Sequence, residues 1–262
     1  MHVTDKTYQE HLVFIELKRY MKFYEQLAMA VFPFVTMGTK AIHNIDTYVY
    51  SSMQGTLESM KLILHGGRIN DTYSLLRKFY DSAVINVYSG LYLRDNFNTE
   101  SYIVQKINNW LLGKERLPEY RVMSQYIKSS KVLRPINDIF GIDNRYKLIR
   151  ARCNDHTHYN FYRHAMLNDN KIYMNNRVKW LDIFSEDIHD LLIMHLGYVF
   201  FLNSHYMMSS DYLDALECGM QPNEDSQYWV APFIQVFFDE VITPRRPDVT
   251  SAIRTNTLIQ LS

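Results

Sequence analysis

The stretch "INDTYSLLRKFYDSAVINVYSGLYLRDN", residues 69–96, decides the fold class of this chain. Its apolar residues recur at steps of three and four, the spacing that places side chains on one face of an α-helix. They are Leu76, Phe79, Tyr80, Ala83, Val84, Val87, Tyr88 and Leu91. The stretch therefore predicts one continuous helix with a core-facing stripe. Asn70 or Asp71 is its predicted N-terminal cap, because short polar side chains accept hydrogen bonds from the first free N–H groups of a helix.

The helical periodicity continues on both sides of this stretch. Helices are expected over residues 14–31, 45–64, 101–112, 120–130, 144 to about 155, 181–216 and 229–241. Gly66-Gly67 is expected to end the second of them, since glycine is favoured just beyond a helix C-terminus. A short extended piece is expected at residues 171–174. Because strands do not alternate with helices, the pattern predicts a single all-α domain over residues 1–262, a helical bundle with additional helices at both ends.

Composition narrows the class of protein further. Hydrophobic residues make up 47% of the 262 residues, enough for a substantial core, and nine glycines with seven prolines are few for an all-β fold. The formal net charge of zero excludes a surface that is basic all over. Two cysteines give no disulfide framework, the N-terminus has no apolar signal region, and the longest apolar run is too short to span a membrane. We therefore expect a cytoplasmic protein without membrane contact.

The chemistry-bearing stretch is "RYKLIRARCNDHTHYNFYRH", residues 145–164. It sets five cations against one acid, Asp155; the cations are Arg145, Lys147, Arg150, Arg152 and Arg163. The planar guanidinium of arginine can donate two parallel hydrogen bonds to phosphate oxygens, and histidines gain or lose protons near neutral pH. These are the groups that metal-free RNA cleavage needs: a base for a 2′-hydroxyl and cations for the charge that grows on the phosphate.

The end of the helix decides which of these groups meet. If the helix continues through the stretch, Arg152 and His156 share a face, because they are four residues apart. If it ends near Asp155, the chain can turn and bring His158 back toward Arg152. We expect the second arrangement, because Asn154 and Asp155 compete well for backbone hydrogen bonds.

An arginine followed after four to six residues by a histidine, late in an all-α bundle, resembles the signature of HEPN domains (higher eukaryotes and prokaryotes nucleotide-binding). Two registers fit, each with five residues between: Arg152 with His158, which we prefer, and Arg150 with His156. Residues 75–88 also resemble a helix of bacterial HEPN-like proteins in which an arginine and an acid, here Arg77 and Asp81, face the bundle. The HEPN-like core would span about residues 45–216, with a C-terminal extension over 217–262.

The resemblance implies a metal-independent ribonuclease, a toxin or a phage-defence effector, whose site is completed in a homodimer or larger homo-oligomer. It implies RNA, with tRNA as one candidate, as the substrate, an antitoxin or defence-system protein as a partner, and no cofactor. Arg152 would hold the scissile phosphate, His158 would be the acid or base, and Asn154 would position them, with His156 either a second participant or a side chain that caps the turn. The remaining assigned residues would bind RNA (Arg145, Lys147, Arg150, Arg163) or support the site (Arg77, Asp81, Asn160).

Other interpretations of this stretch stay open. It can be a polar helix end that is hydrogen-bonded within the bundle. It can be a metal site formed by Asp155, His156 and His158 with His164, although such pairs normally stand at a strand end. The whole chain can also be a catalytically silent helical protein that binds a partner protein or RNA.

Several further polar groups have simple structural interpretations. Arg77 and Asp81 are most simply an ion pair beside the core stripe. The stretch "SEDIHD", residues 185–190, is interpreted as a solvated helix face, and Arg245-Arg246 as a solvated loop. His195 lies on an apolar face and is interpreted as a core histidine.

Overall fold

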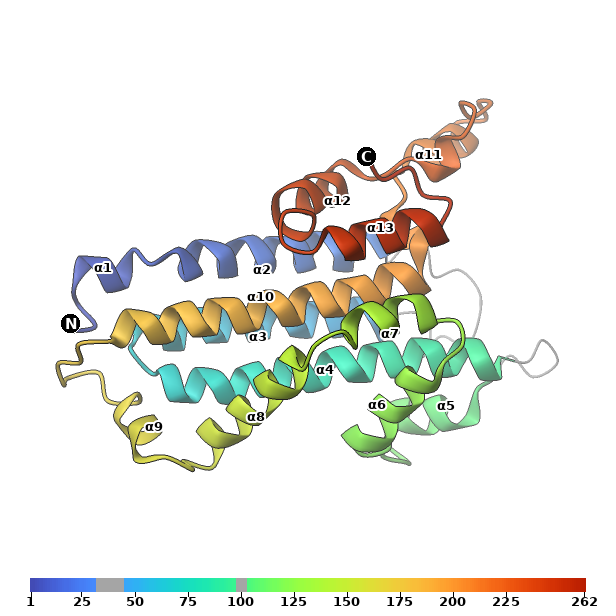
Figure 1. The fold of residues 1–262 in the computed structure, drawn as a ribbon. Coiled ribbons are helices and arrows are strands. Elements are labelled where there is room, and N and C mark those ends of the chain that lie inside the picture. The colour runs from blue at the N-terminus through green and yellow to red at the C-terminus, as the bar shows by residue number, and fades with distance from the viewer. Residues whose placement is uncertain (32–44, 98–102) are drawn as a thin grey trace. The chain divides into compact units, whose positions relative to one another are not determined.

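The computed structural model describes residues 1–31, 45–97 and 103–262, and the statements below concern these ranges. They contain helices and no strand, and their single β feature is an isolated bridge between Met208 and Val230 (Figure 1). The predicted all-α class is therefore confirmed. None of the helices in these ranges is long and apolar enough to cross a lipid bilayer.

The α-helices are α1 (Lys6–Gln9), α2 (Leu12–Val31), α3 (Ile45–His65), α4 (Ile69–Asn96), α5 (Gln105–Leu111), α6 (Tyr120–Ser129), α7 (Arg134–Phe140), α8 (Arg145–Thr157), α9 (Tyr162–Met166), α10 (Arg177–Leu202), α11 (Asp211–Glu217), α12 (Pro232–Phe237) and α13 (Pro247–Asn256). Short 3₁₀ turns cover Ser204–Met207 and Ser226–Tyr228, and a π-helical turn covers Phe238–Ile242.

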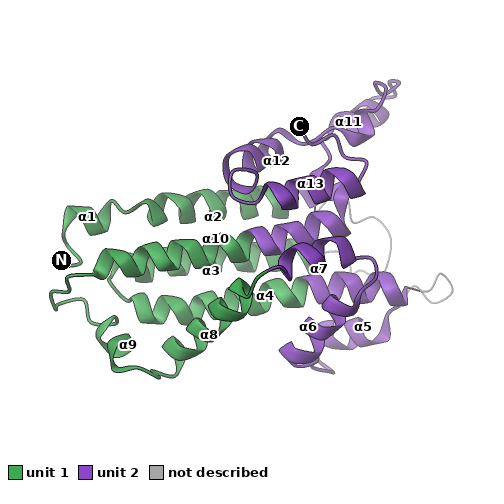
Figure 2. Cartoon of the chain, in the orientation of Figure 1, with its two compact units in different colours: residues 1–29, 44–86, 143–192 green, residues 30–43, 87–142, 193–262 purple. Residues whose placement is uncertain are grey.

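The chain forms two compact units (Figure 2). Unit 1 comprises residues 1–29, 44–86 and 143–192, and unit 2 comprises residues 30–43, 87–142 and 193–262. The predicted limit between a core and a C-terminal extension, at residue 217, lies inside unit 2. Every candidate site residue from the sequence belongs to unit 1.

The core of unit 1 is built by the apolar faces of its long helices. Phe79 of α4 is fully buried, and its ring meets the ring of Tyr24 edge-on at a centroid distance of 5.9 Å. All eight residues of the predicted α4 stripe are buried, five of them in unit 1 and Val87, Tyr88 and Leu91 in unit 2, which confirms that prediction. Burying a side chain of this size contributes roughly 1.5–3 kcal/mol. Gly67, with φ of +80°, ends the turn after α3 in the left-handed conformation that glycine adopts without strain.

Three local expectations were wrong. Asn70 and Asp71 do not cap α4, because the helix begins at Ile69 and both lie in its first turn. No extended piece forms at residues 171–174; the backbone N–H groups of Lys171 and Ile172 instead donate to the side chain of Asp169, which holds a turn.

The third wrong expectation is the long helix predicted over residues 181–216. It stops at Leu202, because Asn203 leaves the helical conformation with φ of −127° and ψ of 63°. The expected helix over 101–112 begins at Gln105, and its first two residues lie outside the described ranges.

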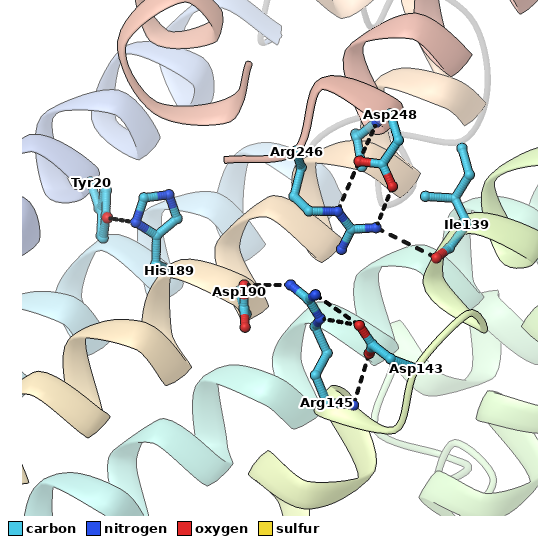
Figure 3. Close-up of polar contacts among 9 residues, drawn as sticks. Tyr20, Ile139, Asp143, Arg145, His189, Asp190, Arg246 and Asp248 are labelled. Atoms are coloured by element: carbon cyan, nitrogen blue, oxygen red, sulfur yellow. Dashed lines mark hydrogen bonds and ion pairs between the residues drawn. The ribbon is translucent and has the colours of Figure 1, made fainter. Parts of the chain in front are cut away.

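Unit 2 contains two buried polar groups that the sequence analysis considered. His195 is fully buried, and burial lowers its pKa to about 3, so its assignment to the core is confirmed. Arg246 was wrongly placed in a solvated loop: it is 7% exposed and donates to both carboxylate oxygens of Asp248 at 2.9 Å (Figure 3). Its guanidinium also lies 5.5 Å from the ring centre of Phe140.

Close packing in unit 2 leads to a first prediction. A methyl group added at Gly197 would lie 2.7 Å from Cζ of Phe140 and 3.2 Å from Cγ1 of Val249. Gly197→Ala is therefore expected to lower the free energy of unfolding by about 1–3 kcal/mol, as overpacking does. The matched control is Gly55→Ala, where the new methyl group meets nothing within 4 Å. That change should raise stability by about 0.5–1 kcal/mol, because alanine favours a helix. Urea denaturation of both variants measures this, and equal effects would contradict it.

Candidate functional site

Helix α8 carries the chemistry-bearing stretch and passes straight through Asp155. It ends at Thr157, two residues beyond the expected end, with His158 as its C-cap. Arg152 and His156 therefore share a face of the helix. His158 lies six residues from Arg152, a rotation of about 240°, so it leaves the helix on a different side. The turn at Asp155 that the preferred pairing of Arg152 with His158 required is replaced by continuous helix.

Arg152 is held by a buried carboxylate. Its Nε lies 2.8 Å from Oδ2 of Asp187 on α10, and the hydroxyl of Tyr73 on α4 donates to the same oxygen at 3.2 Å. The side chain of Arg152 is 34% exposed, whereas that of Asp187 is 5% exposed. Burial raises the pKa of Asp187 to about 6, and the positive charge of Arg152 acts against that rise. Asp187 thus holds Nε of Arg152, whose side chain stays partly exposed.

The interpretation of residues 185–190 as a solvated face was wrong. Asp187 is buried, and its neighbours on α10 are also engaged. Nδ1 of His189 lies 3.0 Å from the hydroxyl of Tyr20, and Asp190 accepts a hydrogen bond from Arg145 at 3.1 Å (Figure 3). The stretch therefore packs α10 against α2 and α8 through polar contacts.

His156 lies in a stack of three rings. Tyr73 and His156 are parallel within 9° at a centroid distance of 4.0 Å, and His156 and His164 are parallel within 19° at 4.0 Å. The indole of Trp180 meets both imidazoles edge-on. Nδ1 of His156 donates to Oδ1 of Asn70 at 2.9 Å, and its Nε2 has no hydrogen-bond partner within the described ranges. His156 is thus a core ring and not a cap of the turn.

The environment of His156 keeps it uncharged. Burial lowers its pKa to about 3, and the nearby His164, Arg152 and Arg163 act in the same direction. His164 is also buried, and its Nδ1 donates to the backbone carbonyl of Asp155 at 3.1 Å. A neutral imidazole with no exposed surface cannot exchange protons with a substrate in this conformation.

A second polar network ties α8 to α4. Arg77 and Asp81 form the predicted ion pair at 3.1 Å. The other oxygen of Asp81 accepts a hydrogen bond from Arg150 at 2.7 Å, and Arg77 also donates to the side chain of Asn154. One carboxylate thus joins two arginines from different helices. Arg77 holds the side chain of Asn154 in position. Together these contacts fix how far α8 is shifted along α4.

The predicted positive patch is largely neutralised. Arg145 is paired with Asp143 at 2.7 Å and with Asp190 at 3.1 Å, and these carboxylates raise its pKa (Figure 3). Arg150 and Arg152 face carboxylates, as described above. Of the five cations, Lys147 and Arg163 are the ones whose side chains are exposed without an ion pair to a described residue.

The exposed groups gather just after α8, in a segment that we call the aromatic loop, residues 158–163. His158 is exposed, as is Arg163, whose guanidinium lies 5.0 Å from the ring centre of Phe161. Tyr159 and Phe161 are each 49% exposed, and Tyr162 is 83% exposed. Tyr159 has φ of +50°, a conformation that costs a bulky residue on the order of 1 kcal/mol. Asn160, which the sequence assigned to support, donates to Asp155 at 2.8 Å.

The metal interpretation finds no support in the geometry. Within the described ranges, no three His, Cys, Asp or Glu side chains are grouped so that they could hold a metal ion. Cys153, next to Arg152, is buried, and burial raises the pKa of its thiol to about 12. That thiol stays protonated and packs as a small apolar group.

Comparison with known proteins adds no family. No protein-family model matches the chain, and neither the curated proteins nor the solved structures give a match.

Four residues of this region were not predicted in the roles that they have: Tyr73 was not considered, Asp187 was assigned to a solvated face, Asn70 to a helix cap and His164 to a metal site. A signal existed for two of them. Tyr73 and Asn70 lie four and seven residues before Arg77, on the same side of α4, and could have been sought with it. Asp187 lies 35 positions from Arg152 and His164 follows α8, so only the folded chain brings them to the site.

Proposed function

We propose that this chain is a metal-independent endoribonuclease of the HEPN type that acts at the aromatic loop, in a toxin or defence system. The observation that carries the proposal is the exposure, within six residues, of an imidazole, three aromatic rings and a guanidinium. Exposed rings stack on unpaired bases, arginine holds phosphate, and an accessible histidine transfers protons. Because His156 is buried, we give the proton transfer to His158 in this proposal.

In the proposed reaction, His158 takes the proton of a ribose 2′-hydroxyl. The 2′-oxygen attacks the adjacent phosphorus, the bond from phosphorus to the 5′-oxygen breaks, and a 2′,3′-cyclic phosphate and a 5′-hydroxyl result. The leaving oxygen takes its proton from a protonated imidazole, which His158 of a second copy supplies in a homodimer. Arg163, which lies in the same segment as His158, stabilises the charge on the phosphate, whereas Arg152, oriented by Asp187, leaves α8 on a different side and holds a neighbouring part of the strand. Arg77 positions Asn154, and no metal takes part.

The test is cleavage of tRNA and total RNA in EDTA. We expect wild-type protein to give fragments with 2′,3′-cyclic phosphate ends. Arg152→Ala/His158→Ala should cleave at least about 100-fold more slowly, since removing a general acid or base costs about that much or more. The matched control is His2→Ala/Arg94→Ala, which removes one exposed residue of each type elsewhere and should cleave like wild type. Equal loss in both double variants, or no cleavage by wild type, contradicts the proposal. Activity that EDTA abolishes contradicts the metal-free mechanism.

One observation favours a second function, a catalytically silent protein that binds RNA or a partner protein. Arg152 is already engaged at 2.8 Å by Asp187, and the nearest histidine on its face, His156, is buried and neutral. RNA binding that depends on the aromatic loop, without cleavage under any condition tried, would favour this function over the nuclease.

A further inference from the structure

The segment that holds α5, α6 and the start of α7 is strongly basic. Residues 105–134 contain seven Lys and Arg residues and two acidic residues, a net charge of +5 in a chain whose total is zero. The cations are Lys106, Lys114, Arg116, Arg121, Lys128, Lys131 and Arg134, and the acids are Glu115 and Glu119. The remainder of the chain therefore carries −5, so the charge is concentrated in this segment of unit 2.

Helix α6 sorts these charges to one side. Met123 and Ile127 are its buried residues. Since each residue turns a helix by about 100°, Arg121, Gln125 and Lys128 lie on the side opposite to the buried pair. All three are exposed, as is Lys131 just after the helix. We call Arg121, Gln125, Lys128 and Lys131 the basic face. Arg121 and Lys128 are about 10 Å apart along the helix axis.

The cations of the basic face are not neutralised in the way that those of α8 are. Within the described ranges, Arg121, Lys128 and Lys131 form no ion pair, whereas Arg134 nearby pairs with Asp138 at 3.9 Å. Surface cations without partners repel one another and are stabilised by a polyanion. The side-chain amide of Gln125 adds hydrogen-bond donors on the same face, the type of group that contacts phosphate oxygens.

We infer that the basic face binds the phosphate backbone of an RNA strand. The inference rests on the proposed function for its choice of polyanion, and it deepens that function by assigning a contact surface outside the aromatic loop. A membrane surface fits less well, because membrane-binding helices insert a broad apolar face, whereas Met123 and Ile127 of α6 are buried and Val122 is its one exposed large apolar residue.

The test measures the affinity of the full chain for a fluorescent single-stranded RNA at several salt concentrations. Arg121→Gln/Lys128→Gln/Lys131→Gln should bind at least about tenfold more weakly at 0.1 M salt, and its slope of log K against log salt should be shallower by about 2, because each phosphate contact in a single strand contributes roughly 0.7. The matched control, Lys18→Gln/Lys22→Gln/Lys78→Gln, removes three exposed lysines of unit 1. It should leave both quantities within about twofold of wild type.

The outcomes separate this inference from the proposed function. Weaker binding and a shallower slope in the basic-face variant alone support the inference, whether or not the RNA is cleaved. Equal changes in the two triple variants, or none in either, overturn it. Binding of wild type to anionic lipid vesicles and not to RNA also overturns it. Cleavage that persists while the basic-face variant binds normally overturns the inference and leaves the ribonuclease standing.

Discussion

The free energy of unfolding is expected to fall steeply as the pH drops from about 6.5 toward 3, and His156→Phe should remove much of this dependence. The pKa of His156 is lowered from 6.5 to about 3 in the folded protein. Between these values the unfolded chain binds a proton and the folded chain does not, so stability is full above pH 6.5 and declines as the pH falls. A shift of this size corresponds to roughly 5 kcal/mol as an upper limit.

Two other groups shape the same titration. His195, whose pKa is also lowered to about 3, contributes in the same direction. Asp187 contributes in the opposite direction: its folded pKa of about 6 lies above the ordinary aspartate value of 3.8, so the folded state binds the proton first and gains stability between these values as the pH falls. Both groups are present in wild type and in His156→Phe, so the difference between the two curves isolates His156.

The phenyl ring keeps the stack between Tyr73 and His164 and loses the hydrogen bond to Asn70. At neutral pH we therefore expect a loss of about 1 kcal/mol. Urea denaturation at intervals between pH 7 and pH 4 measures the slope. The control is His158→Gln, which removes an exposed imidazole and should keep the wild-type slope. If His156→Phe also keeps the wild-type dependence of stability on pH, the pKa of His156 is not lowered in the folded protein.

Asp187→Ala is expected to lower the free energy of unfolding by about 3 kcal/mol. The change removes a buried carboxylate that accepts the hydroxyl of Tyr73 at 3.2 Å and pairs with Arg152 at 2.8 Å. Removing one member of a buried ion pair leaves the charge of the other member without a counter-charge, and this typically costs 3–5 kcal/mol of the free energy of unfolding. The lower figure applies because Arg152 is 34% exposed and can be partly rehydrated.

Two substitutions separate the effect of the Asp187 charge from the effect of losing its side-chain volume. Asp187→Asn keeps an oxygen for Tyr73 and removes the charge, so it should cost less than Asp187→Ala. The matched control on the same helix is Asp182→Ala, whose carboxylate is 62% exposed and pairs with His11 at 3.0 Å. An exposed pair of this kind contributes less than about 1 kcal/mol. Thermal and urea denaturation measure all three variants, and similar losses for Asp187→Ala and Asp182→Ala would show that burial of Asp187 contributes nothing.

Helix identity could be predicted from the sequence where one apolar stripe dominates. Helix α4 has such a stripe, and its bounds agree with the stretch that predicted it. The break after Leu202 could not be predicted in this way, because Tyr206 and Met207 continue the apolar pattern and are buried although the chain has left the helix there. The spacing of apolar residues predicts which residues are buried. It does not predict whether the backbone that carries them is helical.

The sequence singled out the stretch that carries the candidate site but did not predict the contacts within it. The stretch 145–164 does hold the polar contacts, yet helix α8 has apolar residues in too few positions to define its buried side. The partners that bury His156 come from α4, α9 and α10, so its burial depends on tertiary packing. The two-residue difference in where the helix ends was enough to direct His158 away from Arg152, because each residue rotates the side chain by about 100°.

The sharing of Asp81 by Arg77 and Arg150 has an evolutionary consequence. A substitution of Asp81 leaves two guanidiniums close together without their common counter-charge, while a change of one arginine leaves the other pair intact. Effects of substitutions at positions that share a partner are not additive. Tolerated substitutions at these three positions are therefore epistatic. One of the arginines can be substituted first, and Asp81 can be substituted only after at least one arginine has been replaced.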